Sequence, residues 1–195
     1  MPNVLQLKNF QLKNKVKFLK AALQDYKVGA LTPSSKFVVR RILKELNPEY
    51  KFIVEYGAGD GVITKEILKI LPRDGRLVAI ELNGDFIGDL RNIEDERLIV
   101  IHDDVNNVCK KISQFGLPKI DVVISGIPFS LIKPKIRREI IKNTYNMVSS
   151  SGRLIIYQTS PLMLPHLKRF CGTNVRWFFE PRNLVPYFIM VGEKN

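Results

Sequence analysis

The sequence predicts an α/β fold: a Rossmann-like, doubly wound, mostly parallel sheet of seven strands that ends in an antiparallel hairpin. Five short runs, at 52–56, 77–82, 98–102, 120–125 and 154–158, are predominantly apolar and rich in β-branched residues. Continuous rather than alternating hydrophobicity is typical of strands buried on both faces of a parallel sheet. Helix-length segments separate these runs, which is the pattern of repeated βαβ units. Two further strand-like runs close the chain with only three residues between them, too few for a crossover helix, so they form a hairpin.

The expected elements follow in order from the N-terminus. Two helices, at 5–26 and 34–46, precede the first strand, and a loop at 27–33 joins them. Further helices are expected at 61–71, 83–93, 105–115 and 135–148, and the hairpin strands at 175–180 and 184–192. We expect one domain over residues 1–195, in which 1–33 form an amphipathic helix and a loop over the site, and 34–195 form the core.

Composition and charge bound the class of protein and its partners. Lys and Arg number 31 against 19 Asp and Glu, a net charge of +12, which predicts a polyanionic partner, either nucleic acid or an anionic membrane surface. The longest stretch without charged residues, 154–167, contains two prolines and is shorter than the ~20 residues that a spanning helix needs. The N-terminus lacks the pattern of a secretory signal. Cys109 and Cys171 are far apart with no metal-ligand spacing, so we expect reduced thiols, a cytoplasmic location and no metal site.

A glycine-rich turn at 54–61 (VEYGAGDG) joins the first buried strand to a helix. Gly57, Gly59 and Gly61 allow a tight turn and let a ligand approach the amide groups at the helix N-terminus. The dinucleotide fingerprint is GxGxxG, whereas here the pattern is GxGxG and is preceded by Glu55. A carboxylate at that position would repel a pyrophosphate but can pair with a cationic amino group. The turn therefore favours S-adenosylmethionine over NAD.

Acidic residues also end the second and third strands. Glu81, with Leu82 beside it, lies 24 positions after Gly57, where a carboxylate can accept hydrogen bonds from both ribose hydroxyls. Asp104 can accept from an adenine amino group while Val105 packs against the ring. For Asp103 we favour a helix-capping role.

The fourth strand runs into Ser125-Gly-Ile-Pro-Phe129. At this edge the next ligand group would be the reactive methyl and its acceptor, so Ser125, Ile127, Pro128 and Phe129 are candidate acceptor residues, and Ser125 also a cofactor contact. A tight exit turn with Phe129 buried beneath it explains the same residues equally well.

These motifs together resemble the class I S-adenosylmethionine-dependent methyltransferases over essentially the whole chain. Within that superfamily the sequence is similar to the bacterial phospholipid N-methyltransferases, which are related to the rRNA adenine dimethylases. The similarity lies in three segments: FLKA at 18–21 with VGALTPSS at 28–35, SGIPF at 125–129, and RNLVP at 182–186.

The resemblance implies methyl transfer from S-adenosylmethionine to the amino group of a phospholipid headgroup of the phosphatidylethanolamine type, by a monomer held peripherally at the membrane. We expect Leu31 and Thr32 to lie across the methionine end of the cofactor. Tyr26, Phe129 and Tyr157 are candidates for an aromatic face that stabilises the increasingly cationic nitrogen.

Two alternatives stay open, an RNA adenine N6-methyltransferase and a non-catalytic module that keeps the cofactor fold but binds RNA. The adenine dimethylases have an Asn in the fourth-strand motif where this chain has Ser125-Gly126, and they carry an additional C-terminal helical domain. Both differences weaken the RNA alternatives.

Two basic segments could bind a membrane. Within 5–26 an apolar stripe at helical spacing is flanked by lysines, and this helix can lie in the membrane interface or pack on the core. The second segment could hold a lipid phosphate or form the solvated outer face of a helix; it comprises Lys133, Lys135, Arg137, Arg138 and Lys142.

Overall fold

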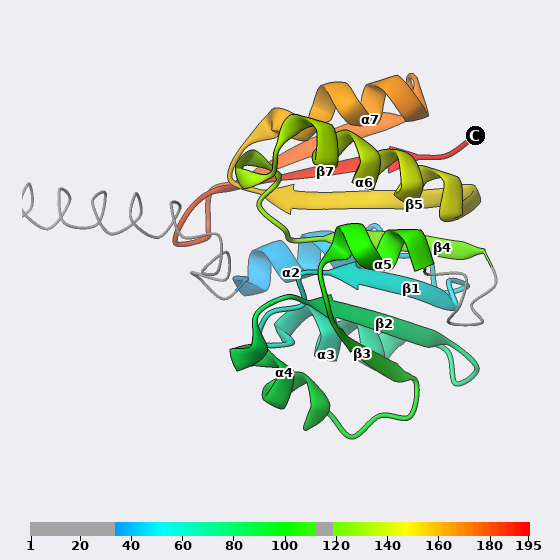
Figure 1. The fold of residues 1–195 in the computed structure, drawn as a ribbon, viewed down its shortest axis with the longest axis vertical. Coiled ribbons are helices and arrows are strands. Elements are labelled where there is room, and N and C mark those ends of the chain that lie inside the picture. The colour runs from blue at the N-terminus through cyan, green and yellow to red at the C-terminus, as the bar shows by residue number, and fades with distance from the viewer. Residues whose placement is uncertain (1–33, 112–118) are drawn as a thin grey trace, which may run out of the picture.

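A computed structural model describes residues 34–111 and 119–195 of the chain, so the expected helix at 5–26 and loop at 27–33 lie outside the described residues. The described chain forms a single seven-stranded sheet in the order β3-β2-β1-β4-β5-β7-β6 (Figure 1). Its strands are β1 Phe52–Tyr56, β2 Arg76–Glu81, β3 Leu98–His102, β4 Ile120–Ser125, β5 Val148–Gln158, β6 Val175–Glu180 and β7 Tyr187–Glu193.

The strand directions confirm the predicted fold class. β1 pairs in parallel with both β2 and β4, and β3 and β5 extend the parallel sheet on either side. β7 is antiparallel to both β5 and β6, so it is the one reversed strand among those described. The order reverses at β1, and a crevice at the carboxyl ends of the strands is expected at such a point.

Helices cover both faces of this sheet. They are α2 Lys36–Leu43, α3 Val62–Ile70, α4 Gly84–Arg91, α5 Val105–Lys111, α6 Pro134–Met147 and α7 Leu164–Cys171, with 3-10 turns η3 Phe129–Leu131 and η4 Pro161–Met163. Helices α5, α6 and α7 pack on one face around Tyr56, Ile140 and Leu167. Helices α2, α3 and α4 pack on the other face, around residues such as Ile42, Ile67 and Leu90. This double layer explains why the inner strands are predominantly apolar on both faces.

The structure differs from the sequence prediction at three places. β5 begins at Val148 rather than at 154, because Val148 already pairs with Ile120 on β4. A register shift that includes the polar residues 149–151 separates this pair from the continuous pairing that begins at Arg153. Helix α7 was not predicted, since it has only eight residues and a proline in its first turn. The last strand begins at Tyr187 rather than at 184, after a turn that contains Pro186.

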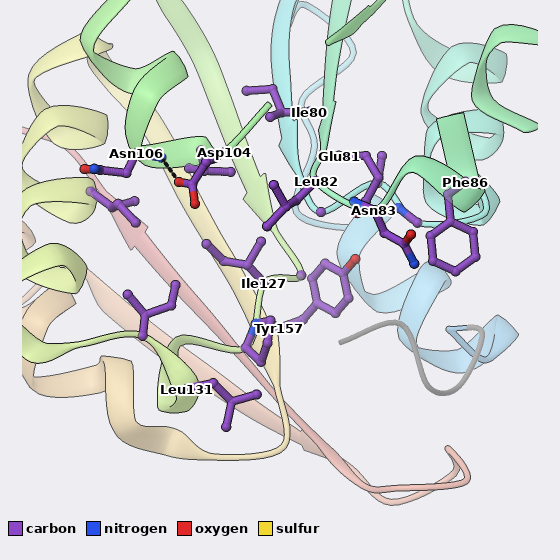
Figure 2. Close-up of a pocket in the computed structure, with 18 of the residues that line it drawn as sticks. Ile80, Glu81, Leu82, Asn83, Phe86, Asp104, Asn106, Ile127, Leu131 and Tyr157 are labelled. Atoms are coloured by element: carbon purple, nitrogen blue, oxygen red, sulfur yellow. Dashed lines mark hydrogen bonds between the residues drawn. The ribbon is translucent and has the colours of Figure 1, made fainter. Parts of the chain in front are cut away.

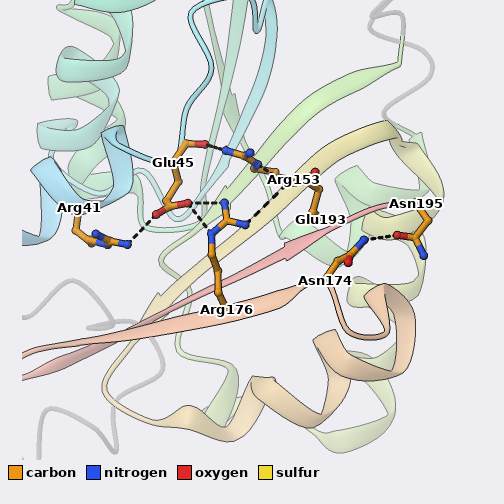
Figure 3. Close-up of polar contacts among 7 residues, drawn as sticks. All are labelled: Arg41, Glu45, Arg153, Asn174, Arg176, Glu193 and Asn195. Atoms are coloured by element: carbon orange, nitrogen blue, oxygen red, sulfur yellow. Dashed lines mark hydrogen bonds and ion pairs between the residues drawn. The ribbon is translucent and has the colours of Figure 1, made fainter.

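A network of ion pairs and hydrogen bonds around the buried Glu45 side chain anchors the end of α2 to the C-terminal hairpin (Figure 3). The Glu45 carboxylate, only 6% exposed, accepts from Arg41 at 3.0 Å and from Arg176 on β6 at 2.6 Å. Arg153 on β5 donates to the Glu45 carbonyl oxygen at 2.6 Å and pairs with Glu193 at 3.0 Å. The segment that leads into β1 is thereby held against β5 and β6, in the half of the sheet that ends in the hairpin.

Two predictions about side chains have different outcomes. Cys109 and Cys171 are both buried free thiols, as expected. Arg137 does not belong to a solvated outer face, because it is only 8% exposed and contributes to the buried side of α6. It lies on the flank of α6 near α7. Burial lowers the pKa of His166 on α7, and the charge of Arg137 adds to the shift.

Within the described residues no helix is long and apolar enough to cross a bilayer.

Candidate active site

The described part of the chain has a large cavity, of about 1140 Å³, at the carboxyl ends of β1, β2 and β4. Its wall includes the glycine turn after β1, the end of β2, the start of α5 and the turn after β4. Figure 2 shows Asp104 and Asn106 at one end and Glu81, Asn83 and Phe86 at the other, with Leu82 and Ile127 between them. The expected residues of three strand ends therefore meet in one cavity.

The glycine turn has the backbone that the sequence pattern requires. Gly57, Gly59 and Gly61 have φ of +72°, +55° and +78°, in the left-handed region that favours glycine. A Cβ atom at Gly57 would lie 2.9 Å from the Ile127 Cγ2 atom, so the turn after β4 packs directly on this glycine. The two turns form a continuous floor at which a ligand can approach the backbone closely.

Glu81 joins the glycine turn to the start of α4. Its Oε2 atom accepts from the Gly59 amide at 2.8 Å, and its Oε1 atom accepts from the Asn83 amide at 2.8 Å. The side chain is largely buried yet lines the cavity. Each carboxylate oxygen can accept a further hydrogen bond, so Glu81 is a fixed acceptor suited to a pair of ligand hydroxyls.

The two aspartates after β3 have different surroundings, and it is Asp104, not Asp103 as expected, whose side chain caps the first turn of α5. Asp104 lines the cavity, and its Oδ1 atom accepts from the Asn106 amide at 2.7 Å (Figure 2). Asp103 accepts from the Asp104 amide and from the Asn107 side chain instead, which lowers its pKa. Val105 and Leu82 also line the cavity.

Glu55 lies below the cavity floor and is not one of its lining residues. Its side chain is fully buried, its Oε2 atom accepts from the Thr64 hydroxyl at 2.6 Å, and its Oε1 atom has no hydrogen-bond partner. Burial raises the pKa of Glu55 to about 8, and the neighbouring Glu81 and Asp60 carboxylates add to the shift. A buried carboxyl oxygen without a partner is costly, so this position is suited to a nearby cationic ligand group.

The turn after β4 divides the expected acceptor residues into two groups. Ile127 and Pro128 line the cavity together with Gly126. Phe129 does not, which corrects the expectation that its ring faces the acceptor: it is fully buried in the core cluster beneath α6. The Ser125 side chain is also buried away from the large cavity, with an unpaired hydroxyl oxygen. The turn after β4 therefore offers the cavity its backbone and the side chains of Ile127 and Pro128.

Two tyrosines, of which sequence reasoning proposed only Tyr157, stand beside this turn. Tyr157 and Tyr187 both line the cavity, and their rings meet edge to face with centroids 5.9 Å apart. A Cβ atom at Gly126 would lie 2.2 Å from the Tyr157 hydroxyl oxygen, so the ring fits only because position 126 is glycine. Burial raises the pKa of Tyr157 well above its ordinary value, so its hydroxyl stays protonated.

An apolar part of the cavity was not expected from the sequence. Leu131 follows the Pro128 turn in η3, and three isoleucines at the start of α6 continue the wall, with Lys133 among them. The isoleucines are Ile132, Ile136 and Ile140. The available signal was that apolar residues cluster directly after the β4 turn. Phe86, Asn83 and Asn106 were also missed, because they lie on helices whose sequences carry no site motif.

Three expected site residues, Tyr26, Leu31 and Thr32, lie outside the described residues. Among residues 34–111 and 119–195, no group of His, Cys, Asp and Glu is arranged to hold a metal ion.

Comparisons with known proteins agree with this geometry. A family model for ribosomal RNA adenine dimethylase matches residues 31–114. The chain is 29% identical over 162 residues to ornithine lipid N-methyltransferase from Singulisphaera acidiphila. The matched residues cover 82% of this chain and 84% of the relative.

Solved structures of methyltransferases share the fold. Precorrin-6y C5,15-methyltransferase from Geobacter metallireducens superimposes with a TM-score of 0.65 at 18% identity, covering 84% of this chain and 91% of that one. N-methyltransferase NodS from Bradyrhizobium japonicum, in complex with S-adenosyl-L-homocysteine, gives a TM-score of 0.63 at 14% identity, covering 91% and 97%.

Proposed function

We propose that this chain, which is a class I S-adenosylmethionine-dependent methyltransferase related to the rRNA adenine dimethylases, methylates the amino group of a lipid headgroup. The observation that carries the proposal is one cavity with two chemically different parts. Strand-end carboxylates and a glycine turn line the first part. Leucine, isoleucine and paired tyrosines line the second.

The first part fits the cofactor. We infer that Glu81 accepts from the ribose hydroxyls, that Asp104 accepts from the adenine amino group, and that Val105 and Leu82 pack against the adenine ring. Glu55 has a pKa of about 8, so it is protonated at neutral pH in the free protein, and its Oε1 atom lacks a partner. We infer that the cationic amino group of the methionine end lowers this pKa and pairs with the ionised carboxylate. Leu31 and Thr32 stay proposed contacts of that same end.

The second part fits a primary amine attached to an apolar molecule. S-adenosylmethionine supplies a methyl group already activated on a sulfonium centre, so the protein has mainly to align a neutral amine and exclude water. We infer that backbone carbonyl groups of the turn at 126–128 accept hydrogen bonds from the amine and so orient its lone pair. The carbonyl oxygens of Ile127 and Pro128 also accept from the amides of Phe129 and Leu131. The faces of Tyr157 and Tyr187 stabilise the cationic product nitrogen, and Tyr26 stays a third candidate for that role.

A lipid is favoured over RNA as the acceptor for two reasons. The match to the adenine dimethylase model ends at residue 114, before the turn at 125–129 that meets the acceptor, so it bears on the cofactor half of the chain. The lipid-modifying relative covers 82% of the chain, and the cavity beyond that turn is apolar. Phosphatidylethanolamine and an aminoacyl lipid such as ornithine lipid carry the same reacting group.

A label-transfer experiment tests this function. The full chain is incubated with methyl-labelled S-adenosylmethionine and either vesicles that contain phosphatidylethanolamine and ornithine lipid, or total RNA. We expect label in the organic phase, on the headgroup nitrogen, and none in RNA. Label in RNA alone would establish the adenine methyltransferase alternative. Cofactor binding with no label in either fraction would indicate a non-catalytic module.

A further inference from the structure

Two exposed aromatic rings lie on the edge strand β6. Trp177 and Phe179 are each 51% exposed, and they alternate along the strand, so both point to the same face of the sheet. Phe188 on β7 lies between them, with ring centroids 6.0 Å from Trp177 and 5.1 Å from Phe179. We call Trp177, Phe179 and Phe188 the aromatic edge. Adjacent exposed aromatic rings are uncommon on a protein surface that only faces water.

The aromatic edge lies on the strongly basic face of the molecule. Phe188 packs on the core cluster that α5, α6 and α7 cover, so the edge and these three helices share one side of the sheet. Together the three helices carry one acidic residue, Glu139, and, besides the buried Arg137, seven exposed basic residues: Lys110, Lys111, Lys135, Arg138, Lys142, Lys168 and Arg169. On the opposite side, α2, α3 and α4 carry six basic and three acidic residues.

The aromatic edge is also close to the apolar part of the cavity. Phe188 follows Tyr187, which lines the cavity, and Phe179 pairs with Phe188 in the hairpin. The turn η4 contacts both β7 and η3, and η3 contributes Leu131 to the cavity wall. A surface that held the aromatic edge would therefore lie next to the place where an acceptor enters.

We propose that the aromatic edge is a membrane-docking surface, which inserts into the headgroup region of an anionic bilayer and brings the cavity to its acceptor lipid. Charge complementarity favours this partner, because the basic helices on the same side attract anionic headgroups while tryptophan and phenylalanine insert at the interface. The proposal rests on the proposed lipid acceptor. It does not depend on whether the helix expected at 5–26 lies in the membrane interface or packs on the core.

Trp177 is the single tryptophan of the chain, so its fluorescence reports on this surface alone. The full-length protein is titrated with vesicles of phosphatidylglycerol and phosphatidylethanolamine, and with phosphatidylcholine vesicles. We expect a blue shift of the emission on the anionic vesicles, together with quenching by lipids brominated at shallow positions in the acyl chain. Unchanged Trp177 emission while the protein sediments with the vesicles would overturn the proposal.

Matched variants distinguish insertion of the aromatic edge from non-specific binding of the protein to vesicles. Trp177→Ser with Phe179→Ser should weaken sedimentation with anionic vesicles at least tenfold, and Trp177→Tyr with Phe179→Tyr should recover most of the binding. Ile70→Ser removes a 48% exposed side chain of α3 on the opposite face and should change nothing. Thermal unfolding and cofactor affinity confirm that each variant is folded. Equal binding by the double serine variant and the Ile70 control would contradict the proposal.

Other occupants of the aromatic edge give different results. A blue shift that depends on protein concentration without vesicles would indicate a second copy of the chain, and one induced by RNA would indicate nucleic acid; either overturns the proposal. Methyl label in lipid with unchanged Trp177 emission would refute the docking surface and leave the proposed lipid acceptor standing. Insertion of Trp177 with no label in lipid would refute the proposed acceptor and leave the docking surface standing.

Discussion

At the scale of single residues, the site depends on carboxylates that backbone amides hold in place. Glu81 accepts from the amides of Gly59 and Asn83, and Asp104 from that of Asn106. Amide donors hold a carboxylate in place without neutralising it, so these acids can still accept from a ligand. The glycine spacing and the strand-end positions made Glu81 and Asp104 predictable, whereas Tyr187 has no motif and reaches the cavity only through the pairing of β7.

Replacing Glu81 tests the ribose contact. Glu81→Gln keeps the size of the side chain but removes the charge and one acceptor oxygen, so paired charge-assisted hydrogen bonds are lost. We expect a loss of about 1.5–3 kcal/mol in cofactor affinity by titration calorimetry with S-adenosylhomocysteine. Asp89→Asn, on α4 but outside the cavity, is the control. Equal affinities for the two variants would refute the ribose assignment.

The pKa of Glu55 predicts a dependence of stability on pH. The folded-state pKa is about 8, against an ordinary value of 4.5, so the folded protein holds this proton more tightly than the unfolded chain does. The associated stability is therefore fully present below about pH 4.5 and is lost as pH rises to about 8. Without cofactor, we expect Glu55→Gln to avoid this loss and to exceed the wild type by a few kcal/mol, in order of magnitude, at pH 8.

Chemical denaturation at several pH values between 4.5 and 8.5 measures this difference. Glu66→Gln, a more exposed acid on α3, serves as the control and should follow the wild type. A constant gap between Glu55→Gln and the wild type over the whole range would show that Glu55 does not titrate there.

At the scale of elements, the first and last residues of the strands were more predictable than the conformation of the segments that follow them. β1, β3, β4 and β6 have the predicted bounds, because each is a run of mostly apolar or aromatic residues. The turn after β4 was ambiguous, since a Pro-Phe sequence suits both a presented and a buried ring. Packing decides the outcome: α6 covers Phe129, and Tyr157 from β5 takes the place beside Gly126 in the cavity wall. Contacts of that kind between distant elements have no local signal in the sequence.

The contact between Gly126 and Tyr157 can be tested directly. Gly126→Ala places a Cβ atom within 2.5 Å of the Tyr157 ring, which the well-packed surroundings cannot absorb without displacing the tyrosine. We expect a loss of about 1–3 kcal/mol in the free energy of unfolding and a lower kcat. Gly88→Ala on α4 has open space around the new atom and should stabilise the protein by about 0.5–1 kcal/mol. Unchanged kcat in Gly126→Ala would argue against a role for Tyr157 beside the reacting amine.

At the scale of the whole molecule, charge is distributed unevenly between the two faces of the sheet. The composition predicted a polyanionic partner but not which surface would meet it, because α5, α6 and α7 are brought together only by the strand order. In Figure 1 these three helices lie across β4, β5 and β7, next to the hairpin that carries the aromatic edge. Their Lys and Arg side chains add a long-range attraction to the short-range insertion of the rings.

A pair of matched charge reversals separates this attraction from the effect of net charge. Lys142→Glu with Lys168→Glu changes two exposed lysines on α6 and α7, and Lys65→Glu with Lys69→Glu changes two exposed lysines on α3. Both variants lose the same charge. Each lysine near an anionic surface contributes about 1 kcal/mol, so the first variant should bind anionic vesicles at least tenfold more weakly at low salt, and the second should bind almost as the wild type does. The difference should shrink as ionic strength rises, because salt screens the attraction but not the apolar insertion. Equal losses in the two variants would mean that net charge, and not the face formed by α5, α6 and α7, directs the protein to the membrane.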